Sequence, residues 1–324
     1  MAPLHPFAGG TYARTVVLTT GKTYDPHGRP PQAGDRSGAP SMTTGMRRGR
    51  RRRWSATGHC RGTGALLRMS AAIGQTALVA EQLLPGGSVN RVVRHGDTVR
   101  RNPGDRADFV HELLRHFEQR GWRGAPRLLG VDEQGFEVLT FLDGYVAWES
   151  ATDLVSSVES LAEVARLVRQ FHDLTAGTPL AGDQEVVCHN DLSPKNTVYR
   201  DGREGMRPLA FLDWDIAAPG ARIHDVAHMC WQYLDLGPAV DDLAATSRRM
   251  RLMCDAYGLA DRSRVVETIL WWQDRCWHGI DAGADAGDAA MASLRASGAV
   301  RTVRAAYDWV LAHRAEIEAT LAWP

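Results

Sequence analysis

The sequence predicts an α+β fold, with a small antiparallel sheet and one helix followed by a larger, mainly helical region. Short β-type segments separated by glycine-containing turns are concentrated in residues 76–142. Helical periodicity dominates from residue 145 onwards. Two polar clusters in this second region, CHNDLSPKNTVY and FLDWD, each come with an apolar run of strand type. With 324 residues the chain is long enough to bury a substantial core.

The first 70 residues differ in composition from the rest of the chain. They are rich in Gly, Pro, Ser, Thr and Arg and show almost no periodicity, so they cannot bury enough apolar surface to offset the entropy of ordering. Residues 1–68 contain twelve Lys or Arg and two acids, which leaves 26 basic and 36 acidic residues for the remainder. We therefore expect a disordered basic extension at 1–70, with Met69 as an alternative start, an N-terminal lobe at 71–143 and a C-terminal lobe at 144–324.

Composition also indicates where in the cell the protein is expected and which kinds of partner it is expected to lack. The arginine-rich run Met46–Trp54 could contact nucleic acid or an anionic membrane, but a disordered tail is the more common role of such a block. There is no run of about 18 apolar residues, so no membrane-spanning helix is expected. The five cysteines are widely spaced and lack a CxxC pair, which favours buried thiols in a reducing compartment over disulfides or a zinc site. We expect a cytoplasmic protein that binds neither membrane nor nucleic acid.

The N-terminal lobe is predicted to hold five short strands and a single helix. Apolar residues on one helical face are followed by a glycine stop, which predicts a helix from Phe109 to Phe117. Strand-type segments with turns at glycine precede and follow this helix. They cover residues 77–84, 89–94, 98–101, 127–131 and 136–142.

The C-terminal lobe is predicted to be helical except around the two polar clusters. An amphipathic pattern indicates a long helix over residues 158–172, before the first cluster. After the second cluster, helical segments are expected to alternate with short breaks, the longest at the Gly/Asp-rich stretch Gly279–Asp288. These segments cover residues 225–234, 240–257, 263–278 and 291–321.

The polar clusters carry the chemistry. His189, Asp191 and Asn196 follow one strand-type run, and Asp213 and Asp215 follow the next. Such an arrangement holds several oxygen atoms around one small volume. A carboxylate can orient a hydroxyl and accept its proton, while amide and carboxylate oxygens suit Mg²⁺. The pattern H-x-D-x-x-x-x-N followed by a strand ending in Asp is typical of kinase-type catalytic loops. The competing interpretation is a set of ordinary turns and caps.

These motifs resemble those of the aminoglycoside phosphotransferase family, which has a bilobal, protein-kinase-like fold. The resemblance covers about residues 83–320 and is densest in GGSVNRVVRHGDTVRR, CHNDLSPKNTVY and FLDWDIAAPGARIHDVAH. It implies that Asp191 is the catalytic base and that Asn196 and Asp213 hold Mg²⁺. Asp215 matches a second acid that family members often carry, and it is expected to be a further ligand of the metal. Two further residues are implied to support the catalytic loop: His189 from within it and Asp225 from a helix.

In the N-terminal lobe the resemblance implies a nucleotide site for ATP or GTP. Backbone amides of Gly86 and Gly87 with the Ser88 hydroxyl are expected to cradle phosphate, although the loop lacks the GxGxxG pattern. The phosphate-binding lysine of the family is replaced by Arg100, or by Arg101 if the register slips by one residue.

The partners of this cation and the base-binding segment are also implied. Glu112 is expected to pair with Arg100, with His111 as the alternative at a one-residue shift. Phe141 and Leu142 are expected to form the hinge between the lobes and to offer backbone groups to the nucleotide base. An ordinary strand end is the competing interpretation of that segment.

Three functions fit these residues: a small-molecule phosphotransferase, a protein kinase, and a nucleotide-binding pseudoenzyme without turnover. Asn190 stands where a protein kinase would have the arginine that binds a phosphorylated activation loop. In addition, only residues 214–223 separate Asp213 from His224, which is too short for such a loop. The intact Asp191, Asn196 and Asp213 argue against a pseudoenzyme. The first function is therefore preferred, with ATP (or GTP) and Mg²⁺ as cofactors.

The acceptor is expected to be a small molecule with a hydroxyl group. Acidic residues after Trp231, with Asp235 and Asp274 as candidates for substrate contact, would attract a cationic amino sugar. The competing interpretation is that these acids serve only solubility. Homoserine and choline-like acceptors stay open, because fold-level analogy does not identify a substrate. The oligomeric state is not predicted.

Overall fold

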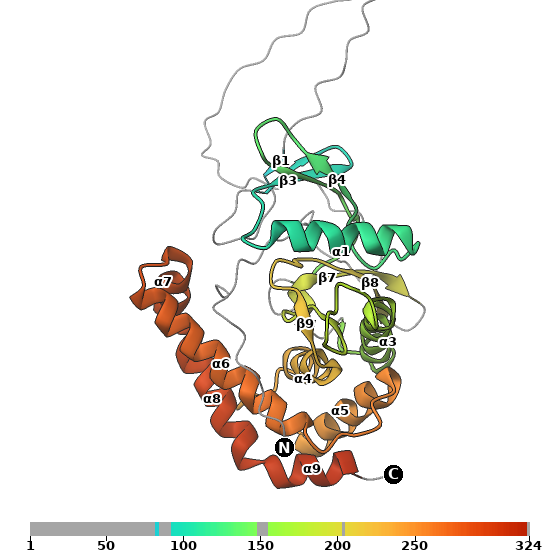
Figure 1. Ribbon diagram of the computed structural model, residues 1–324. Coiled ribbons are helices and arrows are strands. Elements are labelled where there is room, and N and C mark those ends of the chain that lie inside the picture. Colours follow the sequence, from blue (N-terminus) through green and yellow to red (C-terminus); the bar gives the residue numbers. More distant parts are fainter. Residues whose placement is uncertain (1–81, 84–91, 148–154, 203–204, 323–324) are drawn as a thin grey trace, which may run out of the picture. The chain divides into compact units, whose positions relative to one another are not determined.

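The computed structural model describes residues 82–83, 92–147, 155–202 and 205–322 (Figure 1). The predicted extension at 1–70 lies outside these residues. The first sheet is antiparallel with the strand order β1-β2-β3-β5-β4. Its strands are β1 (Gln82–Leu83), β2 (Val93–His95), β3 (Thr98–Arg101), β4 (Leu128–Val131) and β5 (Glu137–Thr140).

Helix α1 (Ala107–Gln119) lies between β3 and β4 in sequence, where the apolar periodicity predicted it. Its buried face includes Val110, Leu113, Leu114 and Phe117, which recur at helical spacing. The predicted order of strands, helix and strands is therefore confirmed.

The chain enters the helical lobe beside strand β7 (Thr197–Gly202). Tyr145 and Tyr199 exchange two backbone hydrogen bonds, of 2.8 and 2.7 Å, which fix this crossing. The approach is so close that a Cβ on Gly144 would lie 2.4 Å from Val198 Cγ1 and 2.6 Å from the Tyr199 carbonyl oxygen. Glycine is therefore required here by space rather than by backbone conformation.

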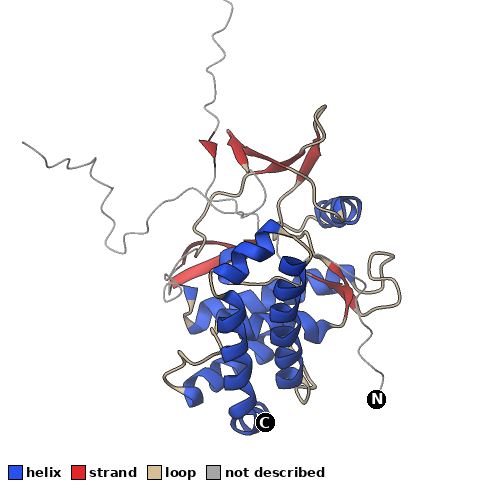
Figure 2. Cartoon of the chain, turned by 90° about the vertical axis from the view of Figure 1, so that its left-hand side faces the viewer, coloured by secondary structure: helices blue, strands red, loops and turns tan. Residues whose placement is uncertain are grey.

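The helical lobe contains two small antiparallel sheets among its helices (Figures 1 and 2). Strands β6 (Val186–Cys188) and β9 (Ala218–Gly220) pair, as do β7 (Thr197–Gly202) and β8 (Gly205–Phe211). The helices are α3 (Val158–Thr175), α4 (Arg222–Tyr233), α5 (Leu243–Tyr257), α6 (Val265–Asp285), α7 (Ala289–Ala296), α8 (Ala299–Ala312) and α9 (Arg314–Ala322).

The C-terminal part corrects the sequence prediction in two places. Helix α6 continues to Asp285, so the break expected over Gly279–Asp288 is limited to residues 286–288. Gly283 lies inside the helix, where a Cβ would be 2.5 Å from Met291 Cγ, so the glycine lets α7 pack closely on α6. The single helix expected over 291–321 is three helices, with a break at Gly298, whose φ is +91°.

A cluster of aromatic rings joins the two lobes. Trp214, which lies between the two acids of FLDWD, is 2% exposed. Its ring lies 5.1 Å from Phe117 of α1 and 5.1 Å from Phe171 of α3, both in edge-to-face geometry. The segment that carries the acids is therefore held by apolar contacts from both sides. The predicted α+β, bilobal kinase-like architecture is confirmed. None of the described helices is long and apolar enough to cross a membrane.

Candidate active site

The catalytic loop leaves the fully buried strand β6 and ends in a short 3-10 turn, Pro194–Asn196. The side-chain amide of Asn196 donates to the Asp191 carbonyl at 2.9 Å and to Asp191 Oδ2 at 2.8 Å. The other end of that amide, Oδ1, is buried and has no hydrogen-bond partner among the described residues. An unpaired buried oxygen is costly, so its position beside a carboxylate suits a cation.

Asp225 holds the start of the loop through its backbone. Its Oδ2 accepts the His189 N–H at 2.7 Å and its Oδ1 accepts the Asn190 N–H at 2.8 Å. His172 Nε2 donates to the same carboxylate at 3.0 Å. Burial alone would raise the pKa of Asp225, but these hydrogen bonds and the nearby histidines hold the pKa below its ordinary value. The carboxylate therefore stays charged and fixes two consecutive amides of the loop.

His172, Cys188 and Asp225 also lie close enough together to be considered as a metal centre. Both ring nitrogens of His172 are already used, since Nδ1 bonds the Tyr257 hydroxyl at 2.7 Å and Nε2 bonds Asp225. The Cys188 thiol donates to the Ala221 carbonyl, and burial raises its pKa. A zinc or similar site needs free nitrogen and thiolate ligands, so this group is a hydrogen-bonded brace.

His189 connects the loop to the second cluster. Its Nε2 donates to the Leu212 carbonyl at 2.9 Å, and its Nδ1 accepts the Asp191 N–H at 3.2 Å. This pattern fixes the neutral tautomer, and burial lowers the pKa of the ring. The ring, with both nitrogens engaged, holds the backbone of Asp191 in place.

The two clusters meet where β8 ends. Asp213 and Asn190 both have positive φ values, +60° and +67°, which are uncommon for residues other than glycine. The Asn190 amide secures its own conformation by donating to the Ile216 carbonyl at 3.0 Å. Backbone outliers of this kind gather at functional sites, where surrounding contacts maintain them. Both acids, Asp213 and Asp215, are 8% exposed.

The structure places Arg100, the first choice for the phosphate-binding cation, away from the acidic cluster. Arg100 lies on the exposed face of β3, with its side chain on Asp132 and Gln134 in the turn after β4. Arg101 faces inward because successive residues of a strand point to opposite faces. It is 4% exposed and bonds Glu137 and Asp215. Arg101, the alternative register, is therefore the arginine beside the acidic cluster.

The expected pair of Glu112 with Arg100 is wrong for the same reason of register. Glu112 lies on the exposed face of α1, while the preceding residue, His111, is buried and bonds Glu137 at 2.8 Å. Sequence reasoning missed Glu137, because a lone glutamate on a strand gives no signal. The alternation of charge across the predicted strand pair could have suggested it, since Glu137 and Arg101 are direct cross-strand neighbours.

Only some of the other residues predicted to bind the nucleotide lie in the part of the chain that the structure describes. Gly86, Gly87 and Ser88 lie outside the described residues. Phe141 and Leu142 follow β5, and the Phe141 N–H is occupied by the Asp97 carbonyl at 2.8 Å. Their side chains pack against a separate apolar cluster drawn from both lobes: Val92, Val99, Val146, Val198 and Leu212.

The acids proposed for acceptor binding are exposed or half-exposed. Asp235 follows α4 in a left-handed turn with φ +45°. Asp274 on α6 lies 3.2 Å from Nδ1 of His278, one turn further along the same helix. The structure does not bring either residue together with Asp191 in a contact among the described residues. Their role in acceptor binding stays a prediction.

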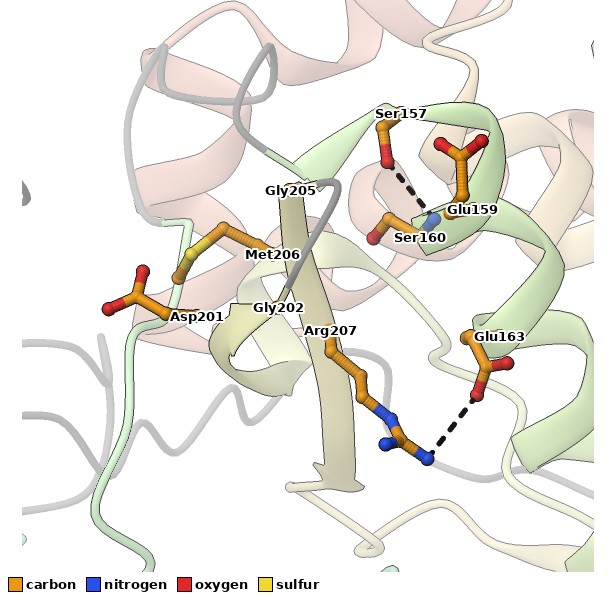
Figure 3. Close-up of a pocket in the computed structure, with 9 residues that line it drawn as sticks. All are labelled: Ser157, Glu159, Ser160, Glu163, Asp201, Gly202, Gly205, Met206 and Arg207. Atoms are coloured by element: carbon orange, nitrogen blue, oxygen red, sulfur yellow. Dashed lines mark hydrogen bonds and ion pairs between the residues drawn. The ribbon is translucent and has the colours of Figure 1, made fainter. Parts of the chain in front are cut away.

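A separate pocket lies between the start of α3 and the end of the β7–β8 hairpin (Figure 3). It is lined by acids such as Glu159 and Asp201, and Arg207 lies 3.8 Å from Glu163 at its side. Its residues come from none of the loop or strand ends that carry Asp191, Asn196 and Asp213. This pocket is therefore distinct from the site described above.

Comparisons with known proteins agree with this geometry. Residues 160–257 match the model of the phosphotransferase enzyme family. The trifolitoxin immunity protein of Rhizobium leguminosarum bv. trifolii is 29% identical over 273 residues, which covers 75% of this chain and 99% of that protein. The GDP complex of the wild-type aminoglycoside 2'-phosphotransferase-IIIa superposes with a TM-score of 0.50 at 11% identity, over 76% of this chain and 94% of that one.

The family match spans both polar clusters and Asp225, so it includes the residues predicted to carry the chemistry. The superposed structure has the same fold. The enzyme class predicted from the sequence, a phosphotransferase, is thereby confirmed. Residues 160–257 of this chain are thus similar to the phosphotransferase enzyme family, in agreement with the resemblance to the aminoglycoside phosphotransferases noted in the sequence.

Proposed function

We propose that this protein transfers the γ-phosphate of ATP to a hydroxyl group of a small molecule, with Asp191 as the base. One observation carries the proposal. Asn196 donates to Asp191 Oδ2 at 2.8 Å and turns an unpaired, buried Oδ1 away from that bond. A base for the hydroxyl and a ligand for a cation are thus adjacent, which is the arrangement that phosphoryl transfer requires.

Mg²⁺ fits the donors that the site offers. Asn196 Oδ1 and the carboxylate of Asp213 are hard oxygen ligands, and Mg²⁺ prefers one or two such ligands with phosphate and water in its other positions. When bound, the metal would neutralise charge on the nucleotide phosphates. Asp191 would orient the acceptor hydroxyl and take its proton, while His189 and Asp225 keep the loop backbone in position.

The nucleotide is proposed to lie between the lobes. Phe141 and Leu142, which are partly exposed and pack on a buried apolar cluster, are proposed to contact the base, and Arg101 supplies positive charge near Asp213 and Asp215. The loop Gly86–Ser88 is proposed to bind the nucleotide phosphates. ATP and GTP should both be assayed, because the superposed phosphotransferase is a GDP complex.

The acceptor is proposed to be a cationic, hydroxylated small molecule such as an amino sugar. The excess of acids in residues 69–324 supports this charge. The 29% identical relative is named for immunity to trifolitoxin, and phosphorylation of a toxic compound is one chemical route to immunity. Toxic compounds with free hydroxyl groups therefore belong in the panel beside aminoglycosides, choline-like alcohols and homoserine.

The test is a coupled ADP-release screen over that panel, with the phosphorylated product identified by mass spectrometry. We expect activity in the wild type and a loss of at least about a hundredfold in Asp191→Asn, since general-base catalysis is worth about 10²–10⁴-fold. Asp308→Asn on the exposed face of α8 is the matched control. If nucleotide binds equally well to the wild type and Asp191→Asn and no hydroxyl compound is phosphorylated, the protein is a nucleotide-binding pseudoenzyme and the proposal fails.

A further inference from the structure

Lys195 is the only lysine in the part of the chain that the structure describes. It is half-buried in the turn Pro194–Asn196, shortly after the proposed base Asp191. Within the described residues its ammonium has neither a hydrogen bond nor an ion pair, whereas Arg101 is bound to two carboxylates. A full positive charge with three donors and no acid paired with it can bind an anion from outside the chain.

The turn that carries Lys195 is held by hydrogen bonds on both sides of this residue. The Thr197 hydroxyl donates to the Ser193 carbonyl at 2.9 Å, and the Asn196 N–H donates to the same carbonyl at 3.0 Å. The Asn196 side chain in turn donates to Asp191 Oδ2 at 2.8 Å. The Lys195 side chain therefore leaves the loop from a backbone position that is fixed relative to the base.

Helix α6 is held against the catalytic loop through α4. His228 Nδ1 of α4 donates to the Leu192 carbonyl of the loop at 3.0 Å. The His228 ring lies 5.0 Å from the ring of Trp272 on α6, in edge-to-face geometry. Trp272 Nε1 also donates to the His224 carbonyl of α4 at 2.8 Å. These contacts set the position of α6 relative to the loop.

Asp191 and Lys195 both lie near Cys276, which follows Trp272 by one turn of α6. Burial raises the pKa of the Cys276 thiol to about 11, the negative charge of Asp191 adds to this rise, and the positive charge of Lys195 opposes it. Because such effects weaken with distance, the two charges are close to the same residue of the helix. The base and the free ammonium are therefore near each other at the side of the loop that faces α6.

This face of α6 offers no opposite charge to Lys195. The residues one turn before and after Cys276 are uncharged: Trp272, Gln273, Gly279 and Ile280. Asp274 lies about 200° around the helix from Cys276, since it is two residues away. An anionic group of a bound acceptor is therefore the partner that fits the ammonium.

We propose that Lys195 binds a carboxylate of the acceptor, beside the hydroxyl that Asp191 orients, so that the acceptor is a zwitterionic hydroxyl compound. This inference rests on the proposed function and narrows its substrate class. The excess of acids attracts an amino group at long range, whereas Lys195 acts on the carboxylate in direct contact. One ammonium balances the single charge of a carboxylate, while a phosphate ester carries a charge of about −1.5 to −2. Homoserine has the hydroxyl, the amino group and the carboxylate together.

The test compares kcat/KM for acceptors that differ only in the carboxylate: homoserine with homoserinamide, and muramic acid with its methyl ester. We expect the wild type to prefer the acid of a pair about tenfold, because a charge-assisted contact is lost in the neutral compound. Lys195→Met should abolish this preference by raising KM for the acid alone, without a change in KM for ATP. Lys195→Arg should keep the preference, since it keeps the charge. Arg248→Met, which removes an exposed cation from α5, is the control that should behave as the wild type.

Equal kcat/KM for the two members of a pair in the wild type would overturn the inference, as would an equal loss for both members in Lys195→Met. A raised KM for ATP in Lys195→Met would mean that the ammonium serves the nucleotide phosphates, which also contradicts it. Thermal unfolding shows whether each variant is folded, and Lys195→Gln replaces the methionine variant if that one is not. A wild type that phosphorylates only compounds without a carboxylate overturns this inference alone. A wild type that phosphorylates no hydroxyl compound overturns the proposed function as well.

Discussion

Single residues in and around the loop His189–Asn196 make several contacts each. Asp225 of α4 illustrates this, since one buried carboxylate accepts hydrogen bonds from two backbone amides of the loop and from His172. His189 likewise bonds the strand end at Leu212 and the backbone of Asp191. Because these contacts converge on the same short loop, removal of one residue should displace Asp191 as well as weaken the fold.

Replacement of Asp225 by asparagine should therefore lower both stability and activity. Loss of the charge leaves His172 and the two loop amides with a weaker partner, so we expect the free energy of unfolding to fall by about 3 kcal/mol. A misplaced Asp191 should lower kcat/KM about a hundredfold. Urea unfolding and steady-state kinetics measure the two effects. Asp308→Asn should change neither, and a variant with full activity would contradict the role of Asp225 as a brace.

Stability should fall as the solution becomes acidic. Burial lowers the pKa of His172, His189, His224 and His228 below the ordinary value of about 6.5. The unfolded chain then binds more protons than the folded one below that pH, so the free energy of unfolding decreases as pH falls. The lowered pKa of Asp225 adds a loss in the same direction at still lower pH.

Urea unfolding at a series of pH values between 7.5 and 5 checks this expectation. The midpoint should move to lower urea concentration across that window. A His228→Asn variant should show a shallower dependence, because it removes one of the four groups. A midpoint that is constant or rises toward pH 5 would contradict the assignment of these rings as buried and neutral.

At the scale of elements, glycines decide where strands and helices can approach one another. Gly144 lets the chain pass against β7, and Gly283 lets α7 lie on α6. Sequence reasoning located the end of the N-terminal lobe near Gly144 but took Gly279–Asp288 for a break. The pattern alone does not distinguish a glycine that ends a helix from one that makes room for a neighbour, because the neighbour is distant in sequence or unassigned.

Gly144→Ala should destabilise the protein at the crossing between the lobes. The new methyl group would overlap Val198 and the Tyr199 carbonyl, and overpacking of this kind costs about 1–3 kcal/mol. Asp143→Ala, at the exposed preceding residue, is the control. Thermal unfolding should show a lower midpoint for the first variant alone. Equal midpoints for the two variants would contradict the steric conflict expected at residue 144.

At the scale of the whole molecule, the sequence predicted the lobes and the catalytic loop but not the side-chain partners. Strong local patterns, such as the apolar face of α1 and the spacing of Asp191 and Asn196, were sufficient for those parts. The register error between Arg100 and Arg101 came from a one-residue ambiguity, which in a strand moves a side chain to the opposite face. Glu137 was missed because its contact with Arg101 depends on the exact register of the strand pair and on the burial of both side chains, and local sequence patterns specify neither.

The contacts between the lobes have a thermodynamic consequence. Phe117 packs on Trp214, and Arg101 bonds Asp215, so the first sheet and its helix depend on residues after β8 for part of their core. Residues 82–143 are few, and a piece of that size buries little surface by itself. The lobes should therefore melt together in a single calorimetric transition, and each should fail to fold when expressed without the other. In heat, the two lobes of this protein are one cooperative unit.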